Sequence, residues 1–268
     1  MDLWKFGTKL PNSNLTIRGH SRGSEKTCFY IPQLELFLDA GIGSPFNPKV
    51  LLITHGHSDH SQALPMLLTC IKTKPVICVP KQNKALFENY YRTCNDLNRC
   101  GNVVEVEALF PITGVSVGDI IQINKTYSAV VFEMDHGVPT NGYGIYETRQ
   151  RLKNEYKLID GKELGKMRRA NIEINENFIV PTFAYICDTS IKVFDINPTI
   201  LNYPTIIIEC TFICPQTVEV AKQSCHIHYS ELEPIILKNP QITFILIHFS
   251  MRYKEIEIKP DNVILWLN

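Results

Sequence analysis

The stretch Ile53–Ser61, ITHGHSDHS, places three histidines and an aspartate within six positions, from His55 to His60. It begins in the apolar run VLLIT, which is typical of a buried strand. Residues two apart in an extended chain point the same way, so His55 and His57 can reach one point. Asp59 follows where the chain turns into a helix. Imidazole and carboxylate groups are ligands for zinc and similar divalent ions, so this pattern predicts a metal site.

Three more polar residues end β-rich runs far along the chain. His136 follows the run YSAVVFEM, Asp188 ends FAYICD, and His248 ends ITFILIH. Each is unremarkable alone, because a single histidine after a strand usually has a structural role. If these strands end at one edge of a sheet, their polar residues can join the histidine-rich segment, and together they supply enough ligands for two metal ions.

Length and composition are those of a globular protein. The chain has 268 residues, of which 44% are hydrophobic and 20% charged, so it can bury a sizeable core. The net charge is zero and the pI is about 7.1. Any surface for a polyanion must therefore be a local patch and not a property of the whole chain.

No segment indicates export or membrane insertion. The N-terminal MDLWKFGTKLPNSN lacks a basic start followed by an apolar run, and no apolar stretch approaches the ~20 residues that cross a bilayer. The nine cysteines are an odd number without a CxxC pair, which indicates reduced thiols and argues against structural zinc. We therefore expect an intracellular protein, cytoplasmic or nuclear or both, without a membrane partner.

Short runs rich in Val, Ile, Tyr and Phe predict strands at 27–31, 34–39, 50–54, 76–80, 102–106, 119–123, 127–134, 142–148, 183–188, 205–210, 242–248 and 263–267. Helices are predicted at 61–72, 84–94 and 230–239, with a shorter one at 219–223. This order favours an α/β (α+β) fold in which two mixed sheets pack together between helices, an αββα sandwich. Without repeats or Gly/Ser-rich linkers, we expect one domain over 1–268.

One basic segment, 147–174, interrupts this pattern. Its basic side chains outnumber its acids and are Arg149, Arg151, Lys153, Lys157, Lys162, Lys166, Arg168 and Arg169. Two interpretations remain open at this point. The segment is either the solvated face of a surface helix or an arm that contacts phosphates.

These motifs resemble those of the metallo-β-lactamase fold and, within it, the ribonuclease Z family of endonucleases that mature tRNA 3′ ends. HGHSDH is shared with many hydrolases of the fold, whereas HGVPTNGYGIYE, IIIECTF, CHIHYSE and HFSMRY are similar to ribonuclease Z. The resemblance runs from LFLDAG, which contains Asp39, to HFSMRY, and is greatest to the short form found in plants. It implies a zinc-dependent endoribonuclease that removes the 3′ trailer of precursor tRNA and leaves a 3′-hydroxyl.

The resemblance also implies two Zn²⁺ ions per subunit, with other divalent ions as alternatives. By position, the ligands of one ion would be His55, His57 and His136, those of the other Asp59, His60 and His248, with Asp188 bridging the two. Two such ions activate water and neutralise charge on a phosphate. Asp59 is placed to orient or deprotonate that water.

The leaving 3′ oxygen needs a proton, which a histidine outside the metal set should donate. The segment CHIHYSELEP contains two candidates. If Ser230 and Glu233 form a capping box at a helix start, alignment with the family's His-Ser-Thr loop selects His228. Counting back from His248 without gaps selects His226 instead. We favour His228 and keep His226 as the alternative.

Other positions match the family or depart from it. Glu209, after TIII, matches the family glutamate that holds the proton-donating histidine, although a strand-end acid alone would more often lie on the surface. Cys187 stands before Asp188 where the family usually has glycine. The Pro- and Arg-Asn-containing loop of bacterial relatives is not recognisable near the N-terminus, so substrate discrimination there is open.

The basic segment falls where family members carry an arm that grips the tRNA elbow, although it lacks the Gly- and Pro-rich character of the bacterial arm. The resemblance favours the arm interpretation and implies that the tRNA contacts are Lys162, Lys166, Arg168, Arg169 and, in HFSMRY, Arg252. In the family, the arm of one subunit serves the active site of the other, which implies a homodimer.

Two other functions are consistent with the fold. One is a hydrolase acting on a thioester or a small phosphodiester, but such substrates need neither a basic arm nor the CHIHYS segment. The other is an RNA-binding relative without catalysis. The presence of every expected ligand argues against that loss.

Overall fold

The structure, a computed structural model, describes residues 3–70, 74–99, 110–258 and 260–267. Two seven-stranded sheets form its centre. Sheet 1 runs in the order β1 (Gly7–Lys9), β2 (Thr16–Arg22), β3 (Lys26–Ile31), β4 (Leu36–Leu38), β5 (Val50–Leu52), β6 (Val76–Pro80) and β7 (Ile112–Val115). Sheet 2 runs in the order β14 (Val263–Leu265), β13 (Thr243–Ile247), β12 (Thr205–Glu209), β11 (Asn175–Ile186), β10 (Asn141–Leu152), β9 (Tyr127–Glu133) and β8 (Ile120–Gln122).

The two sheets share one topology. In sheet 1 the pairs from β1 to β4 are antiparallel and those from β4 to β7 are parallel. In sheet 2 the pairs from β8 to β11 are antiparallel and those from β11 to β14 are parallel. The second half of the chain thus repeats the strand pairing of the first, although the sequence contains no recognisable repeat. Parallel strands end together at one edge, where open sheets commonly bind ligands.

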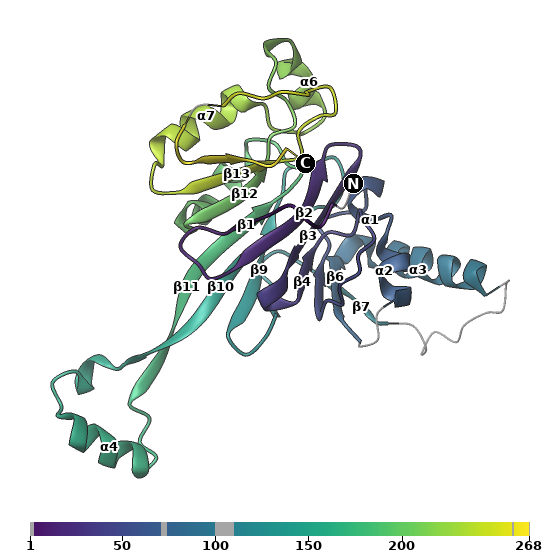
Figure 1. The fold of residues 1–268 in the computed structure, drawn as a ribbon. Helices are drawn as coiled ribbons and strands as arrows, with labels where there is room; N and C mark the ends of the chain where they lie inside the picture. The colour runs from purple at the N-terminus through teal and green to yellow at the C-terminus, as the bar shows by residue number, and fades with distance from the viewer. Residues whose placement is uncertain (1–2, 71–73, 100–109, 259, 268) are drawn as a thin grey trace.

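Helices cover the outer faces of both sheets, and one further helix, Gly161–Arg169, lies away from them (Figure 1). They are α1 (Ser58–Ser61), α2 (Leu64–Cys70), α3 (Lys84–Asn98), α4 (Gly161–Arg169), α5 (Val193–Ile196), α6 (Val218–Gln223) and α7 (Tyr229–Lys238). Phe29 and Tyr185 belong to the apolar core between the sheets. Phe87 of α3 packs in a second core with sheet 1, and Leu232 of α7 packs in a third with sheet 2. These layers are the predicted αββα sandwich.

Most predicted strands are present, with shifted ends. The prediction at 102–106 lies outside the described residues. β1, β2 and β7 are absent from the prediction, because the short or polar runs GTK, TIRGHSR and ITGV carry little apolar pattern. Seven cysteines among the described residues are free thiols: Cys28, Cys78, Cys94, Cys187, Cys210, Cys214 and Cys225. No helix among the described residues combines the length and apolar character that a membrane span requires.

The helix predicted at 61–72 is instead two short helices, α1 and α2. The break has a local cause. The Ala63 backbone N–H donates to the Ala40 carbonyl oxygen over 2.9 Å instead of continuing α1. Pro65, which has no N–H, follows in the first turn of α2. Helix α1 therefore begins at Ser58, earlier than the predicted start at 61, and its single turn carries Asp59 and His60.

Segment 147–174 forms an arm. The ladder between β10 and β11 continues from the pair Glu147–Val180 to the pair Leu152–Asn175, and α4 follows at the far end of this ribbon, away from the sheets (Figure 1). The prediction ended β10 at 148 and began β11 at 183, because the outer strand residues are polar and lack the alternation of a half-buried strand. No residue of α4 is buried. The arm thus carries an exposed helix.

Candidate metal and catalytic site

The predicted ligands meet beyond the ends of several strands. Asp188 follows β11 and His248 follows β13, and Asp39, which was not predicted as a ligand, follows β4. These three residues have φ values of 41°, 63° and 62°, in the left-handed region that side-chain-bearing residues rarely adopt. Such local strain persists only where the surrounding structure holds it, and it is common at functional sites.

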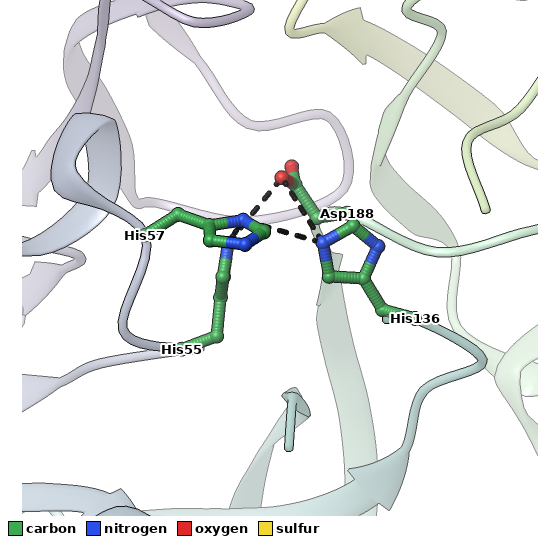
Figure 2. A group of neighbouring side chains, drawn as sticks. All are labelled: His55, His57, His136 and Asp188. Carbon is green, nitrogen blue, oxygen red and sulfur yellow. Dashed lines mark hydrogen bonds and ion pairs between the residues drawn. The ribbon is translucent and has the colours of Figure 1, made fainter. Parts of the chain in front are cut away.

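Figure 2 shows the first group of candidate ligands, which contains three histidines and an aspartate. His55 Nε2 lies 2.9 Å from His57 Nδ1 and 3.4 Å from Asp188 Oδ2. His136 Nε2 lies 3.4 Å from His57 Nδ1 and 3.9 Å from Asp188 Oδ2. The ligand atoms of all four residues therefore face one point.

A second group shares Asp188 with the first. His60 Nε2 lies 3.5 Å from Asp59 Oδ2 and 3.2 Å from His248 Nε2. Asp188 Oδ1 lies 3.5 Å from His60 Nε2 and 3.3 Å from His248 Nε2. The two oxygens of Asp188 thus face different groups, as expected of a bridging ligand. Cys187, the departure from the family pattern, leaves this carboxylate in place and contacts Asp188 Oδ1 through its Sγ over 3.2 Å.

Ring nitrogens lie unusually close together in this cluster. Ligands on a tetrahedral zinc ion, with bonds of about 2.0 Å, are themselves about 3.3 Å apart. The separation of 3.2 Å between His60 Nε2 and His248 Nε2 agrees with that value. The donor set of imidazole nitrogens and carboxylate oxygens is also the set that zinc prefers. The residues present therefore fit a pair of divalent ions.

Hydrogen bonds on the far side of the imidazoles fix which nitrogen faces the cluster. Four of the five rings donate their Nδ1–H to a protein oxygen: His60 to Asp39 Oδ2 (2.9 Å), His55 to Thr54 Oγ1 (3.0 Å), His248 to Thr211 Oγ1 (2.9 Å) and His136 to Cys225 O (3.2 Å). His57 instead faces the cluster with its Nδ1. The two threonine hydroxyls can accept because they donate their own hydrogens, Thr54 to Asp39 and Thr211 to Glu209. The Nε2 atoms of these four rings therefore face the cluster, where a cation would replace any proton that they carry.

The pKa shifts differ within the cluster: burial lowers the pKa of His55 and of His136, whereas the second group of ligands favours a protonated ring. Although burial opposes the shift, the carboxylates of Asp188 and Asp39 raise the pKa of His60 to about 10. Burial also opposes ionisation of Asp59, yet the hydrogen bond from His248 and the charge of His60 lower its pKa. The ionised carboxylates that raise the pKa of His60 would equally attract metal ions.

Glu209 and His226 form a buried pair at the edge of the cluster. Glu209 Oε1 lies 2.7 Å from His226 Nδ1 and accepts the Thr189 backbone N–H over 2.8 Å. Although burial opposes it, the Glu209 charge and hydrogen bond raise the pKa of His226 to about 9. The His226 ring lies 5.1 Å from that of His136 and 5.5 Å from that of His248. A protonated imidazole therefore adjoins both groups of ligands.

His228, the favoured proton donor of the sequence analysis, has a different position. It is the N-cap residue of α7: its Nδ1 accepts the Ser230 backbone N–H over 3.2 Å, and its Nε2 donates to the Cys214 carbonyl oxygen over 2.9 Å. The predicted capping box of Ser230 and Glu233 is therefore wrong, because α7 starts earlier, at Tyr229, and His228 itself caps it. Glu209 contacts His226 and not His228, so the alternative candidate is the histidine that adjoins the ligands.

Three supporting residues were missed as parts of the site. Asp39, noted only as part of a motif, binds His60 and also accepts the Tyr185 hydroxyl over 2.7 Å. Its position after a β-rich run was the same signal that identified Asp188. The Ser24 backbone N–H donates to Asp59 Oδ2 over 3.0 Å, which no sequence pattern indicated. Gly41 allows α1 to approach, because a Cβ there would lie 1.9 Å from the Asp59 carbonyl oxygen.

The predicted tRNA contacts divide into two places. The four on the arm, all exposed on α4, are Lys162, Lys166, Arg168 and Arg169. Arg252 instead lies near the cluster. Its guanidinium lies 5.4 Å from the centre of the Phe212 ring, which is 6.2 Å from the ring of His226.

A two-sheet αββα sandwich with two histidine- and aspartate-rich ligand groups beyond its strand ends defines a protein of the metallo-β-lactamase fold. Solved structures agree. The short form of human tRNase Z (ELAC1) has a TM-score of 0.56 at 15% identity and covers 92% of this chain and 93% of its own. The metallo-β-lactamase fold protein YhfI from Bacillus subtilis has a TM-score of 0.53 at 12% identity and covers 87% and 85%.

Sequence comparison resolves the family. The tRNase Z TRZ1 of Arabidopsis thaliana is 31% identical over 252 residues, which are 90% of this chain and 88% of that relative. The chloroplastic tRNase Z TRZ2 of the same plant is 29% identical over 253 residues, 91% and 70% of the two chains. The chain therefore belongs to the ribonuclease Z (tRNase Z) family of metal-dependent endoribonucleases. No protein-family profile matches it.

Proposed function

We propose that the chain is a zinc-dependent endoribonuclease that cuts precursor tRNA after the discriminator nucleotide, removes the 3′ trailer and leaves a tRNA 3′-hydroxyl. The observation that carries this proposal is the contact between Glu209 and His226 beside two groups of ligands that share Asp188. The two groups of ligands, with ions bound, would activate water, and the pair of Glu209 and His226 can protonate a leaving oxygen.

The ligands named in the sequence analysis would hold the two ions. The seven residues are His55, His57, Asp59, His60, His136, Asp188 and His248. Bound zinc supplies charge neutralisation for the phosphate and lowers the pKa of water. Asp59, kept ionised at neutral pH, orients the attacking water. The Asp59 carboxylate also accepts the Ser24 backbone N–H and so holds the turn between β2 and β3 beside the site.

His226 completes the reaction at the opposite end of the scissile bond. Attack on phosphorus breaks the P–O3′ bond, and the electron pair passes to the 3′ oxygen. The imidazolium of His226, whose Nδ1–H is held by Glu209, donates the Nε2 proton to that oxygen. Glu209 is a positioning residue, fixed by the backbone N–H groups of Thr189, Thr211 and Ile227.

We also propose a homodimer in which the arm of one subunit contacts the tRNA bound at the partner's site. The projection of α4 away from the sheets supports this arrangement (Figure 1). Mixing two impaired variants at a tRNA concentration at which the arm variant does not bind tests it: His248→Ala removes a ligand, and Arg168→Gln with Arg169→Gln weakens the arm. A mixed dimer has one site with all ligands and an intact arm in trans, so about a quarter of the wild-type activity should return. No recovery would support action in cis.

Mapping the cut on an end-labelled precursor tRNA tests the main proposal. We expect a single cut after the discriminator nucleotide, a 3′-hydroxyl on the tRNA, loss of cleavage with chelator and recovery with zinc. A small chromogenic phosphodiester should be hydrolysed far less efficiently. Efficient hydrolysis of the small ester without tRNA cleavage would instead identify another hydrolase of the fold. Binding of tRNA without cleavage of either substrate would identify an RNA-binding relative.

A further inference from the structure

A cleft of about 490 Å³ opens directly beside the first group of ligands. His57 contributes to both, since its Nδ1 faces His55 while its side chain also lines the cleft. One wall comes from α3, with Leu86, Phe87 and Tyr90, and the loop after His136 contributes Val138 and Pro139. The cleft is thus continuous with the proposed catalytic centre, although no step described above uses it.

The lining has the chemistry of a stacking site. Leu86 is 67% exposed and Tyr90 is 38% exposed, whereas Phe87 beneath them is buried. The Tyr90 hydroxyl donates to the Gln62 carbonyl oxygen over 2.8 Å, which helps to fix the ring. The Asn83 side chain also lines the cleft and has no hydrogen-bond partner among the described residues, so its amide can both donate and accept. Flat, aromatic groups with polar edges fit such a surface.

We propose that this cleft binds the nucleobase of the first trailer nucleotide, the one directly 3′ of the scissile phosphate. The inference rests on the proposed function. Any RNA whose phosphate lies between the ligands must place the adjoining nucleotide on the surface that borders them, and on the His57 side that surface is the cleft. Single-stranded RNA is bound by stacking of bases on aromatic and apolar side chains, with little dependence on base identity.

The position of His226 decides which neighbour of the phosphate occupies the cleft. The leaving 3′ oxygen belongs to the tRNA side and must approach His226. The His136 ring contacts both other rings: its centre lies 5.1 Å from that of His57 and 5.1 Å from that of His226. His57 lines the cleft, whereas His226 does not. The mature tRNA end therefore enters from the His226 side, and the trailer leaves past His57.

A two-by-two kinetic comparison tests the inference on the full chain. One pair is the wild type and the variant Leu86→Ser with Tyr90→Ser. The other pair is a normal precursor tRNA and one with an abasic first trailer nucleotide. We expect kcat/KM of the wild type to fall roughly tenfold on the abasic precursor. The variant should lose a similar factor on the normal precursor and little more on the abasic one. Leu97→Ser, which alters a 74% exposed residue of the same helix outside the cleft, should behave like the wild type.

If the abasic precursor lowers kcat/KM by the same factor for the wild type and for the variant, the inference is overturned, because the base would then bind outside the cleft. If the variant does not fold, 2-aminopurine at the first trailer position gives a second readout with the wild type in chelator. Its fluorescence should be quenched on binding, and the same probe at the third trailer position should be quenched less. Equal fluorescence at both positions would overturn the inference. Failure of the wild type to cut the normal precursor would contradict the proposed function itself.

Discussion

The Glu209 carboxylate holds His226 by a hydrogen bond of 2.7 Å from Nδ1–H, and this orients the opposite nitrogen of the ring. Glu209 is fully buried and receives three backbone N–H groups, so it cannot relax toward solvent. His248, a candidate ligand, lies stacked beside His226, with an angle of 25° between the rings. The proposed proton donor and the candidate ligand His248 are therefore stacked side by side, and Glu209 holds the proposed donor in that position.

Removal of His226 should impair the chemical step more than binding. We expect His226→Ala to lower kcat for precursor tRNA about 10²–10⁴-fold while KM changes little, because the leaving oxygen loses its proton donor. Single-turnover kinetics with saturating enzyme measure this directly.

His228→Ala is the matched variant, two residues along the same segment. It removes the cap of α7 and the bond to the Cys214 carbonyl oxygen, so we expect a loss of about 1–2 kcal/mol in stability and a lower Tm. The kcat of the folded variant should remain near that of the wild type. The reverse pattern, a catalytic defect at His228 and only a stability defect at His226, would return the donor role to His228.

Glu209→Gln should change the pH dependence of cleavage. The Glu209 carboxylate raises the pKa of His226, so His226 is protonated at neutral pH. It loses this proton as the pH rises through about 9. Without that charge the folded-state pKa falls, and the alkaline limb of the kcat profile should move to lower pH. An alkaline limb at the same pH in both proteins would show that another group controls it.

Arg168→Gln combined with Arg169→Gln should weaken tRNA binding and flatten its salt dependence. Each phosphate contact that is lost lowers the slope of log K against log salt by ~1. Lys222→Gln with Lys238→Gln provides a control of equal charge change, since both lysines are exposed on α6 and α7. Titrations at several salt concentrations measure the slope. The same slope in all three proteins would remove the arm from the RNA interface.

The fold and the ligands were predictable because both depend on short, regular signals. Apolar runs of strand length locate the sheets, and the polar residue at the end of each run locates the site, as with Asp188 and His248. The same signal marked Asp39, which was not recognised as a partner of His60. The contact between Ser24 and Asp59 joins two segments through a backbone N–H, so no side-chain pattern could indicate it.

Two other features depend on tertiary context. His226 and His228 differ only in the direction of their side chains, and that direction follows from where α7 begins. The start was misplaced because Ser230 and Glu233 matched a capping pattern, whereas a histidine supplies the cap. The length of β10 and β11 was missed because the arm strands pair with each other and have no apolar core to pack against.

The account rests most directly on the number of ions that the chain binds. Native mass spectrometry of the zinc-reconstituted wild type and of Asp188→Ala measures this number without an activity assay. We predict two zinc ions per wild-type chain and fewer than two in the variant, which lacks the residue shared by both ligand groups. A wild-type chain that binds one zinc ion or none, or a variant that retains two, would contradict the paired metal site.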